Sequence, residues 1–401
     1  NYICPKLSNM KKLFIPILLS LVAFKGIAQN NIEELNPITT GVPFILIAAD
    51  PRAAGMGDIG VTTSADAFSQ QWNPAKYAFS LSKQGVGVTY TPYLSKLVND
   101  IFLGNITYYN RLNERSALGA SFRYFSNGEI ELRQTADDPG LQVKPNELLF
   151  DVSYSLRLSE RFSMAVAGRY IRSDLKLQTG FDDASAANTF AVDVAGYYQS
   201  EEIPYNDFDG RWRMGFNISN IGPKLKYDEV GSESNLPTNL ALGGGFDFIL
   251  DEYNKVGVSV EVNKLLVPTP QDPDINGDGE ITSEERSQTI RDYENISFFS
   301  GIFESFGDAP GGFSEELKEF TWALGAEYWY QDVFAFRGGY FNESDMKGGR
   351  KFATIGAGFR YTAINIDISY LFSTSKLANS PLDGTLRFGL TFNFGDTYDE
   401  Y

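Results

Sequence analysis

The chain has 401 residues, with 34 basic and 51 acidic side chains and a formal net charge of −17 at pH 7. A chain this acidic repels nucleic-acid phosphates, which excludes nucleic acid as a partner. Aromatic residues make up 14% of the chain, a fraction that distinguishes it from disordered acidic sequences.

Residues 1–28 predict an export signal rather than folded structure. Met10 and two lysines open a short basic segment, an apolar run follows from Leu13 to Phe24, and small residues end at Ala28. This order is typical of a secretory signal peptide, with cleavage expected near Ala28 and Met10 as the expected initiator. The apolar run is shorter than the about 20 residues of a transmembrane helix, and a membrane anchor is the alternative.

Residues 29–83 do not alternate as strands do. The segment is rich in small residues and contains a Gly-Met-Gly turn and an Asn-Pro-Ala turn, where proline keeps Asn73 out of the helical region. A polar segment without strands is a candidate plug when a barrel follows it, so we expect 29–83 to form an N-terminal hatch. Its motif residues are Gly55, Met56, Gly57, Asn73, Pro74 and Ala75.

From about Gln84 to the end, apolar residues alternate with small or charged ones. In 386–394 (LRFGLTFNF) the leucines and phenylalanines share one face, and in 256–263 (VGVSVEVN) four valines do so. This period of two predicts strands with one apolar face. Fourteen segments follow it, at approximately 84–92, 100–110, 115–125, 146–157, 161–176, 187–199, 210–221, 238–250, 253–267, 318–330, 332–342, 350–361, 363–373 and 384–395.

The length and spacing of these segments predict a membrane barrel. Strands of soluble proteins usually have about five or six residues, whereas a tilted strand needs about 9–11 to cross a bilayer, and most of these segments are long enough. The links after even-numbered segments are mostly short and the others long and polar, with 200–209 as the exception. This is the plan of an outer-membrane barrel. The predicted fold is therefore all-β: a transmembrane barrel of about 14 antiparallel strands over 84–401, with a long external loop at 268–317. A soluble pair of β-sandwiches is the alternative.

In such a barrel the apolar faces meet lipid and the small or charged faces line the interior. Inward carboxylates such as Asp151, Glu261 and Asp367 leave acid–base chemistry open. However, histidine is absent and the only cysteine, Cys4, precedes the signal, so the usual catalytic sites are excluded and we expect no enzyme. Aromatic residues expected in the interfacial girdles are Tyr108, Tyr109, Tyr328, Trp329, Tyr330, Tyr361 and Tyr370.

Within the 268–317 loop, DINGDGEITSEE has the spacing of a calcium-binding loop. The candidate ligands at positions 1, 3, 5, 7, 9 and 12 are Asp274, Asn276, Asp278, Glu280, Thr282 and Glu285. Prolines in 266–273 exclude an entering helix, whereas 282–293 is expected to form an exit helix. We expect a structural calcium site with weak affinity, about 10⁻⁴–10⁻³ M, and the alternative is an acidic surface loop.

The same loop continues with phenylalanines interleaved with glycine and serine. Exposed aromatic clusters on a loop favour contact with a protein partner, although contact with outer-membrane lipid or folding over the lumen are alternatives. The partner-binding candidates are Phe298, Phe299, Phe303, Phe306 and Phe313.

Three motifs resemble those of the PorV/PorQ group, relatives of the FadL-type transporters of hydrophobic compounds. They are DPRAAGMG at 50–57, WNPA at 72–75 and LPTNLALG at 236–243, and the resemblance covers essentially the whole mature chain. The resemblance implies a FadL-like barrel of fourteen strands with an N-terminal hatch, which agrees with the count from periodicity.

The resemblance also implies a function, as a non-enzymatic outer-membrane component of the type IX secretion system with a link to gliding motility. Members of the group bind a giant outer-membrane translocon barrel and receive secreted cargo proteins that carry C-terminal signal domains. They pass this cargo to a surface attachment complex. The alternative is a FadL-like transporter or channel for hydrophobic small molecules.

Overall fold

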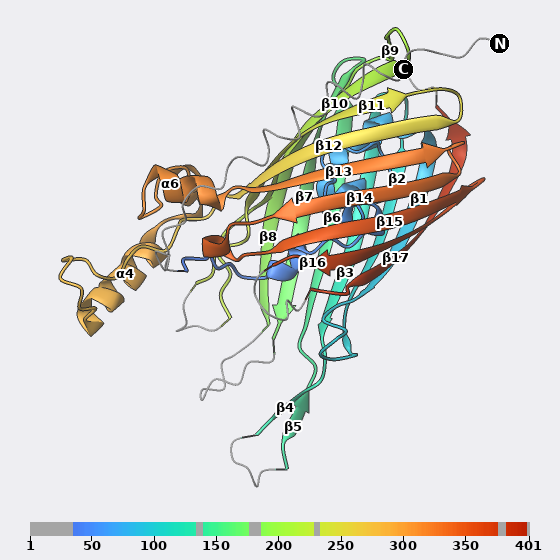
Figure 1. Cartoon of the computed structure of the whole chain (residues 1–401). Coiled ribbons are helices and arrows are strands. Elements are labelled where there is room, and N and C mark those ends of the chain that lie inside the picture. Colours follow the sequence, from blue (N-terminus) through green and yellow to red (C-terminus); the bar gives the residue numbers. More distant parts are fainter. Residues whose placement is uncertain (1–34, 134–138, 176–185, 228–232, 376–381, 399–401) are drawn as a thin grey trace. The chain divides into compact units, whose positions relative to one another are not determined.

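The computed structural model describes residues 35–133, 139–175, 186–227, 233–375 and 382–398 (Figure 1). The predicted signal peptide and residues 29–34 lie outside the described residues. None of the helices in the described part is long and apolar enough to cross a membrane.

A closed ring of fourteen long antiparallel strands dominates the fold and confirms the predicted barrel. Each strand pairs with its neighbour along the chain, and the last pairs with the first. The strands are β1 (Ser82–Pro92), β2 (Ile101–Arg111), β3 (Ser116–Asn127), β6 (Asn146–Arg157), β7 (Phe162–Asp174), β8 (Ala187–Gln199), β10 (Asp209–Ile221), β11 (Asn239–Ile249), β12 (Asn254–Leu265), β13 (Thr321–Tyr330), β14 (Phe334–Asn342), β15 (Lys351–Tyr361), β16 (Ile364–Ser373) and β17 (Leu386–Thr397).

The links confirm the predicted alternation of short turns and longer loops. Those after β2, β6, β11, β13 and β15 are short, and the exceptional link after β8 contains a two-residue strand, β9 (Ile203–Pro204), that pairs with the start of β10. That link therefore extends the β8–β10 hairpin beyond the ring. At the other end, β4 (Ile130–Leu132) and β5 (Leu141–Val143) form a separate small hairpin (Figure 1).

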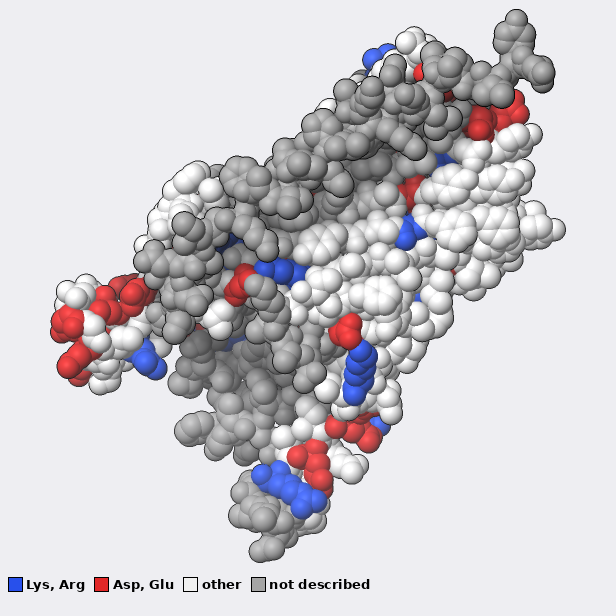
Figure 2. Space-filling model, in the orientation of Figure 1, with Lys and Arg blue, Asp and Glu red and all other residues white. Residues whose placement is uncertain are grey.

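Exposure alternates along the strands as the sequence predicts. On β17, Phe388 and Phe392 are exposed outside the barrel and Arg387 is buried inside it; on β12, Val260 is exposed and Glu261 is buried. The visible wall in Figure 2 accordingly carries few charged side chains. An apolar outer wall is what a bilayer requires of a barrel.

Two aromatic residues expected in the girdles instead point inward. Tyr109 is 2% exposed, and its ring stacks on Tyr77 with 5.0 Å between the centroids. Trp329 lies 5.6 Å from the guanidinium of Arg337, which is buried in the barrel. Successive side chains of a strand face opposite sides, so Tyr108 and Tyr109 cannot both face lipid.

Residues 35–81, named here the interior segment, run inside the ring before β1 (Figure 1). The segment contains four short helices: η1 (Pro43–Leu46), α2 (Pro51–Ala54), α3 (Ser69–Trp72) and η2 (Pro74–Phe79). Each is too short to be stable alone, so the segment depends on the barrel wall for its shape.

The remaining helices lie in the longer links. The 266–320 link holds α4 (Ser283–Asn295), α5 (Phe298–Glu304), α6 (Phe313–Glu316) and η3 (Leu317–Glu319), and the 343–350 link holds η4 (Asp345–Lys347). Helix α4 begins with a capping box in which the Thr282 hydroxyl and the Glu285 carboxylate each accept a backbone N–H. This helix confirms the predicted exit helix after the calcium-like loop.

Candidate functional site

The interior segment touches opposite sides of the ring, and the Gly-Met-Gly motif makes one set of contacts. Gly57 has a φ of +77°, and its N–H donates to Thr354 Oγ1 on β15 at 2.9 Å. A Cβ added to Gly339 of β14 would lie 2.0 Å from the carbonyl carbon of Met56. Glycine at this position of the wall therefore lets the two backbones pack directly against each other.

The Asn-Pro-Ala motif makes the contacts on the other side. The Asn73 side chain donates to the Gly196 carbonyl on β8 at 3.0 Å and accepts from the Ala75 N–H at 3.1 Å. Pro74 is the first residue of η2, where its missing N–H costs no hydrogen bond. Ser163 Oγ on β7 donates to the Ala75 carbonyl at 2.7 Å. The structure thus places all six predicted motif residues in the interior segment, where their contacts reach the wall.

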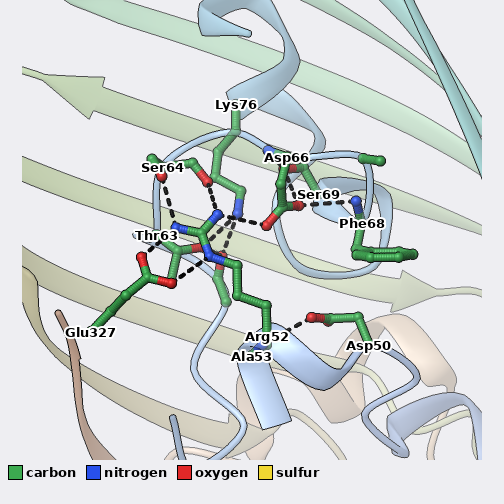
Figure 3. A network of polar contacts seen from close by, with 12 residues as sticks. Asp50, Arg52, Ala53, Thr63, Ser64, Asp66, Phe68, Ser69, Lys76 and Glu327 are labelled. Carbon is green, nitrogen blue, oxygen red and sulfur yellow. Dashed lines mark hydrogen bonds and ion pairs between the residues drawn. The ribbon is translucent and has the colours of Figure 1, made fainter. Parts of the chain in front are cut away.

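Between these two sides, Arg52 is the centre of a buried ion-pair network (Figure 3). Its Nε and Nη2 donate to both carboxylate oxygens of Glu327 on β13, at 3.0 and 2.7 Å, and its Nη1 donates to Asp66 at 2.8 Å. The network continues along the wall, because Arg337 donates to Glu327 and to Asp367, each at 2.6 Å. Bidentate pairing between a guanidinium and a carboxylate fixes the orientation of the two side chains in addition to the electrostatic attraction between them.

Burial and neighbouring charges shift the pKa values of ionisable side chains in the interior segment. Burial would lower the pKa of Arg52, but the carboxylates of Glu327 and Asp66 outweigh it and raise that pKa. Burial lowers the pKa of Lys76 to about 8, and burial together with Asp66 raises that of Asp50 to about 6. The shifts of Lys76 and Asp50 arise mainly because protein rather than water surrounds these groups, whereas the shift of Arg52 comes from its carboxylate partners.

The inward carboxylates considered for acid–base chemistry have structural partners. Glu261 accepts the N–H groups of Gly60 and Val61, each at 3.0 Å. Asp151 accepts from Ser121 Oγ at 2.6 Å, and Asp367 belongs to the Arg337 network. Each therefore holds the wall or the interior segment in place.

A cavity of about 860 Å³ lies within the half of the barrel that carries the longer loops. Its apolar lining includes Phe44 of the interior segment, Phe125 and Phe352, and its polar lining includes Arg350 and Arg387. Residues 37–48 pass along it, and Gln71 and Trp72 also line it. The interior segment thus forms part of the cavity wall.

The calcium-like loop is exposed and wraps around its first residue. The N–H groups of Gly277 and Gly279, both with positive φ, donate to the two carboxylate oxygens of Asp274 at 2.8 and 2.9 Å. Glu285 is engaged in the cap of α4 and accepts from the Thr282 N–H at 3.0 Å. The structure does not gather the loop's carboxylates. Among the described residues, three carboxylates within 4.8 Å of one another occur at Asp308, Glu316 and Glu319 instead.

The five phenylalanines proposed as a partner surface lie on α5, α6 and the link between them, and between 38% and 77% of each is exposed. Phe299 and Phe303 form an edge-to-face pair with 5.4 Å between centroids. Figure 2 shows acidic side chains gathered over the projecting α4 region, which directly precedes α5 in the chain. The 266–320 link thus exposes both apolar and acidic side chains.

Sequence reasoning missed the charged groups that hold the interior together. Arg52 lies within the quoted 50–57 motif but had no assigned partner, because Glu327 is 275 positions away along the chain. Asp66, Lys76 and the Asp308 cluster were not identified. For Arg52, Asp66 and Lys76, the available signal was the presence of charged residues in a segment otherwise rich in small ones.

Comparison with known proteins gives a family match. A family model described as type IX secretion system protein PorV matches residues 29–272, which is more than half of the chain. No curated protein matches the chain.

Several solved structures are similar to the chain at low identity. They include the CymD monoaromatic hydrocarbon channel (13% identity, 87% of this chain and 98% of that one, TM-score 0.48). A Pseudomonas aeruginosa FadL homologue has 13% identity over 90% of this chain and 100% of that one, with a TM-score of 0.44. The Pseudomonas putida toluene transporter TodX has 10% identity over 90% and 99%, with a TM-score of 0.47.

Proposed function

This chain belongs to the family of the type IX secretion system protein PorV, and from that premise we propose that it binds the system's translocon and its cargo. It is an outer-membrane β-barrel of that family. The proposed cargo proteins carry C-terminal signal domains, and the proposed translocon is a giant outer-membrane barrel. We further propose that the chain passes the cargo to a surface attachment complex. The family match carries this proposal.

The exposed phenylalanines of the 266–320 link support a role in binding protein. Large exposed apolar patches with a polar rim are typical of interaction sites, and aromatic residues supply much of the binding energy at such sites. Phe299, Phe303 and Phe313 are the most exposed of the five. We propose that these three contact the translocon or cargo.

The interior segment supports a hatch role in the same proposal. Its contacts reach β7 and β8 on one side and β13, β14 and β15 on the other. We propose that it keeps the barrel closed, so that partners act at the outer rim and not through the lumen.

The secretion role is tested by deleting the gene and measuring release of proteins with C-terminal signal domains. We expect loss of release, rescue by the unaltered gene, and failure of rescue when Phe299, Phe303 and Phe313 become serine. About tenfold less translocon should co-purify with the triple variant than with the unaltered protein, as expected for the loss of central aromatic anchors.

The matched control changes apolar residues of comparable exposure on the same link. Ile275, Ile281 and Ile290 are about half exposed and lie in the calcium-like loop or on α4. Their change to serine is expected to leave rescue intact. Intact release after deletion of the gene would reject the secretion role.

The second candidate function is a FadL-like transporter or channel for hydrophobic small molecules. The apolar part of the cavity, with Phe44, Phe125 and Phe352, favours it. A transporter would take up a hydrophobic probe in liposomes or cells and lose that uptake on cavity substitution, with secretion unaffected. The same secretion and uptake assays therefore separate the two candidates.

We also propose that the DINGDGEITSEE loop binds calcium as a structural ion. Its spacing and its wrapping around Asp274 support the proposal, and calcium would supply the positive charge that the acidic loop lacks.

Calcium at ten times its dissociation constant is expected to slow proteolysis of the loop about tenfold. Asp274→Ala or Glu285→Ala should abolish that protection, whereas Asp292→Ala on α4 should keep it. Equal digestion of the unaltered protein in calcium and in chelator would contradict the proposal.

A further inference from the structure

The exposed calcium-like loop contains an asparagine followed by a glycine, Asn276 and Gly277, and their surroundings favour a reaction of the loop with itself. The same pair occurs at one other place in the sequence, at Asn127 and Gly128. In such a pair the glycine nitrogen can attack the asparagine side-chain carbonyl, because glycine has no side chain to block the close approach. The rate of that attack depends on the groups that contact the two reacting atoms.

The attacking group is the backbone nitrogen of Gly277, and a carboxylate is hydrogen-bonded to it. The Gly277 N–H donates to Asp274 Oδ1 at 2.8 Å. The second carboxylate oxygen of Asp274 accepts the Gly279 N–H at 2.9 Å, which holds the carboxylate in this position. A general base acts at about 2.6–3.2 Å from the atom whose proton it removes, so Asp274 is correctly placed to take the proton of Gly277.

The group under attack is the side-chain amide of Asn276, whose carbonyl oxygen already accepts a hydrogen bond. The Asp278 N–H donates to Asn276 Oδ1 at 2.8 Å. Negative charge develops on this oxygen when a nitrogen adds to the amide carbon, and a backbone N–H about 2.7–3.1 Å away stabilises that charge. Asn276 and Gly277 are both exposed, and the space where a Cβ of Gly277 would lie is open. The loop therefore leaves room for ring closure and for the entry of water.

We propose that Asn276 is a self-modification site, at which Asp274 promotes deamidation as a general base. The Gly277 nitrogen forms a bond to the Asn276 amide carbon while its proton passes to Asp274. The bond from that carbon to Nδ2 then breaks, and Nδ2 leaves as ammonia with the proton from Asp274, which completes a succinimide ring. Water opens the ring at either carbonyl and gives aspartate or isoaspartate. The reaction consumes only water and releases only ammonia.

The products change the loop in two ways. Each adds a negative charge to a loop that already carries Asp274, Asp278 and Glu280. Isoaspartate also places the former side-chain carbon in the main chain, so we expect the turn around Asp274 to be lost. The modification alters the loop permanently as the protein ages. This inference depends neither on the proposed calcium binding nor on the proposed secretion role, because it uses only contacts within the metal-free loop.

The other pair, Asn127 and Gly128, has different surroundings and provides an internal comparison. Asn127 is the last residue of β3, and its backbone pairs with Ile101 of β2. Gly128 is buried, and its N–H donates to the Ser126 hydroxyl at 3.3 Å. A hydroxyl is a far weaker base than a carboxylate, and a paired strand does not bend easily into a ring. We therefore expect this pair to react slowly in the folded protein.

The test follows deamidation at both pairs in the folded mature protein, in detergent with a calcium chelator at neutral pH. Peptide mass spectrometry over several weeks measures the two rates. We expect Asn276 to react at least about tenfold faster than Asn127, and Asp274→Asn to slow the reaction at Asn276 about 100-fold, the low end for loss of a positioned base. Asparagine at 274 keeps a side-chain acceptor for the Gly277 N–H but cannot take its proton.

Glu284→Gln is the matched control, because it also removes one carboxylate charge. Glu284 is exposed in the first turn of α4 and takes no part in the hydrogen bonds to Asn276 and Gly277, so the rate should not change. Unfolding in urea removes the arrangement, so the rate at Asn276 should fall while the rate at Asn127 rises. Equal rates at Asn276 in the Asp274→Asn and Glu284→Gln variants, or faster reaction of Asn276 in the unfolded chain than in the folded one, would overturn the proposal.

Discussion

Glu327→Gln is expected to destabilise the folded barrel by about 3–5 kcal/mol, the usual cost of removing one partner from a buried ion pair. Glu327 accepts from Arg52 of the interior segment and from Arg337 of the wall, at 2.6 to 3.0 Å, and little of its side chain is exposed. Glutamine keeps the shape but presents an amide N–H₂ to one of the guanidinium groups. Urea unfolding in detergent micelles, followed by tryptophan fluorescence, measures the change.

Glu129→Gln is the control for this variant. Glu129 also forms an ion pair at 2.6 Å, with Lys144, but both side chains are more than half exposed. Solvent screens such pairs, so the unfolding midpoint should not change measurably. Equal midpoints for Glu327→Gln and the unaltered protein would show that the network does not hold the interior segment in place.

Gly339→Ala is expected to destabilise the protein by about 1–3 kcal/mol or more, the range for overpacking a filled interior. The added methyl would lie 2.0 Å from the Met56 carbonyl carbon and 2.3 Å from the Gly57 nitrogen. Both are backbone atoms, which cannot rotate away as a side chain can. The interior segment must shift on this side, and the same urea titration detects the loss of stability.

Gly338→Ala on the same strand is the matched control. The nearest atom to a Cβ there is the Thr354 carbonyl oxygen, at 3.9 Å, because this glycine faces outward. We expect a change within about 0.5 kcal/mol, as for most surface substitutions. Equal effects of the two substitutions would mean that the interior segment does not pack against β14 as described.

Much of the barrel can be predicted from the sequence because the direction of each side chain in a strand depends only on its position along that strand. Alternation of apolar with small or charged residues is set by the strand period, so the fourteen strands and their faces can be predicted from segments such as 386–394. The same rule shows why two girdle residues were misplaced. Tyr109 follows Tyr108 directly, and only the alternation phase of the whole strand shows that Tyr109 faces the interior.

The arrangement of the interior could not be predicted in this way. Arg52 pairs with Glu327 on the barrel wall, and Met56 packs against Gly339. These contacts depend on how the interior segment lies inside the barrel, which the alternation of residues along a strand does not specify. Glu319, near the end of the long link, likewise pairs with Lys264 of β12 and with Lys347 of η4, which are far from it in the sequence. What the sequence does show is that residues 29–83 break the strand pattern, which identifies the segment but not its partners.

The most direct test of the secretion role is purification of the tagged native protein from solubilised outer membranes, with its partners identified by mass spectrometry. We predict recovery of a giant outer-membrane barrel together with secreted proteins that carry C-terminal signal domains. A preparation containing the intact barrel protein without either class of partner would contradict this account.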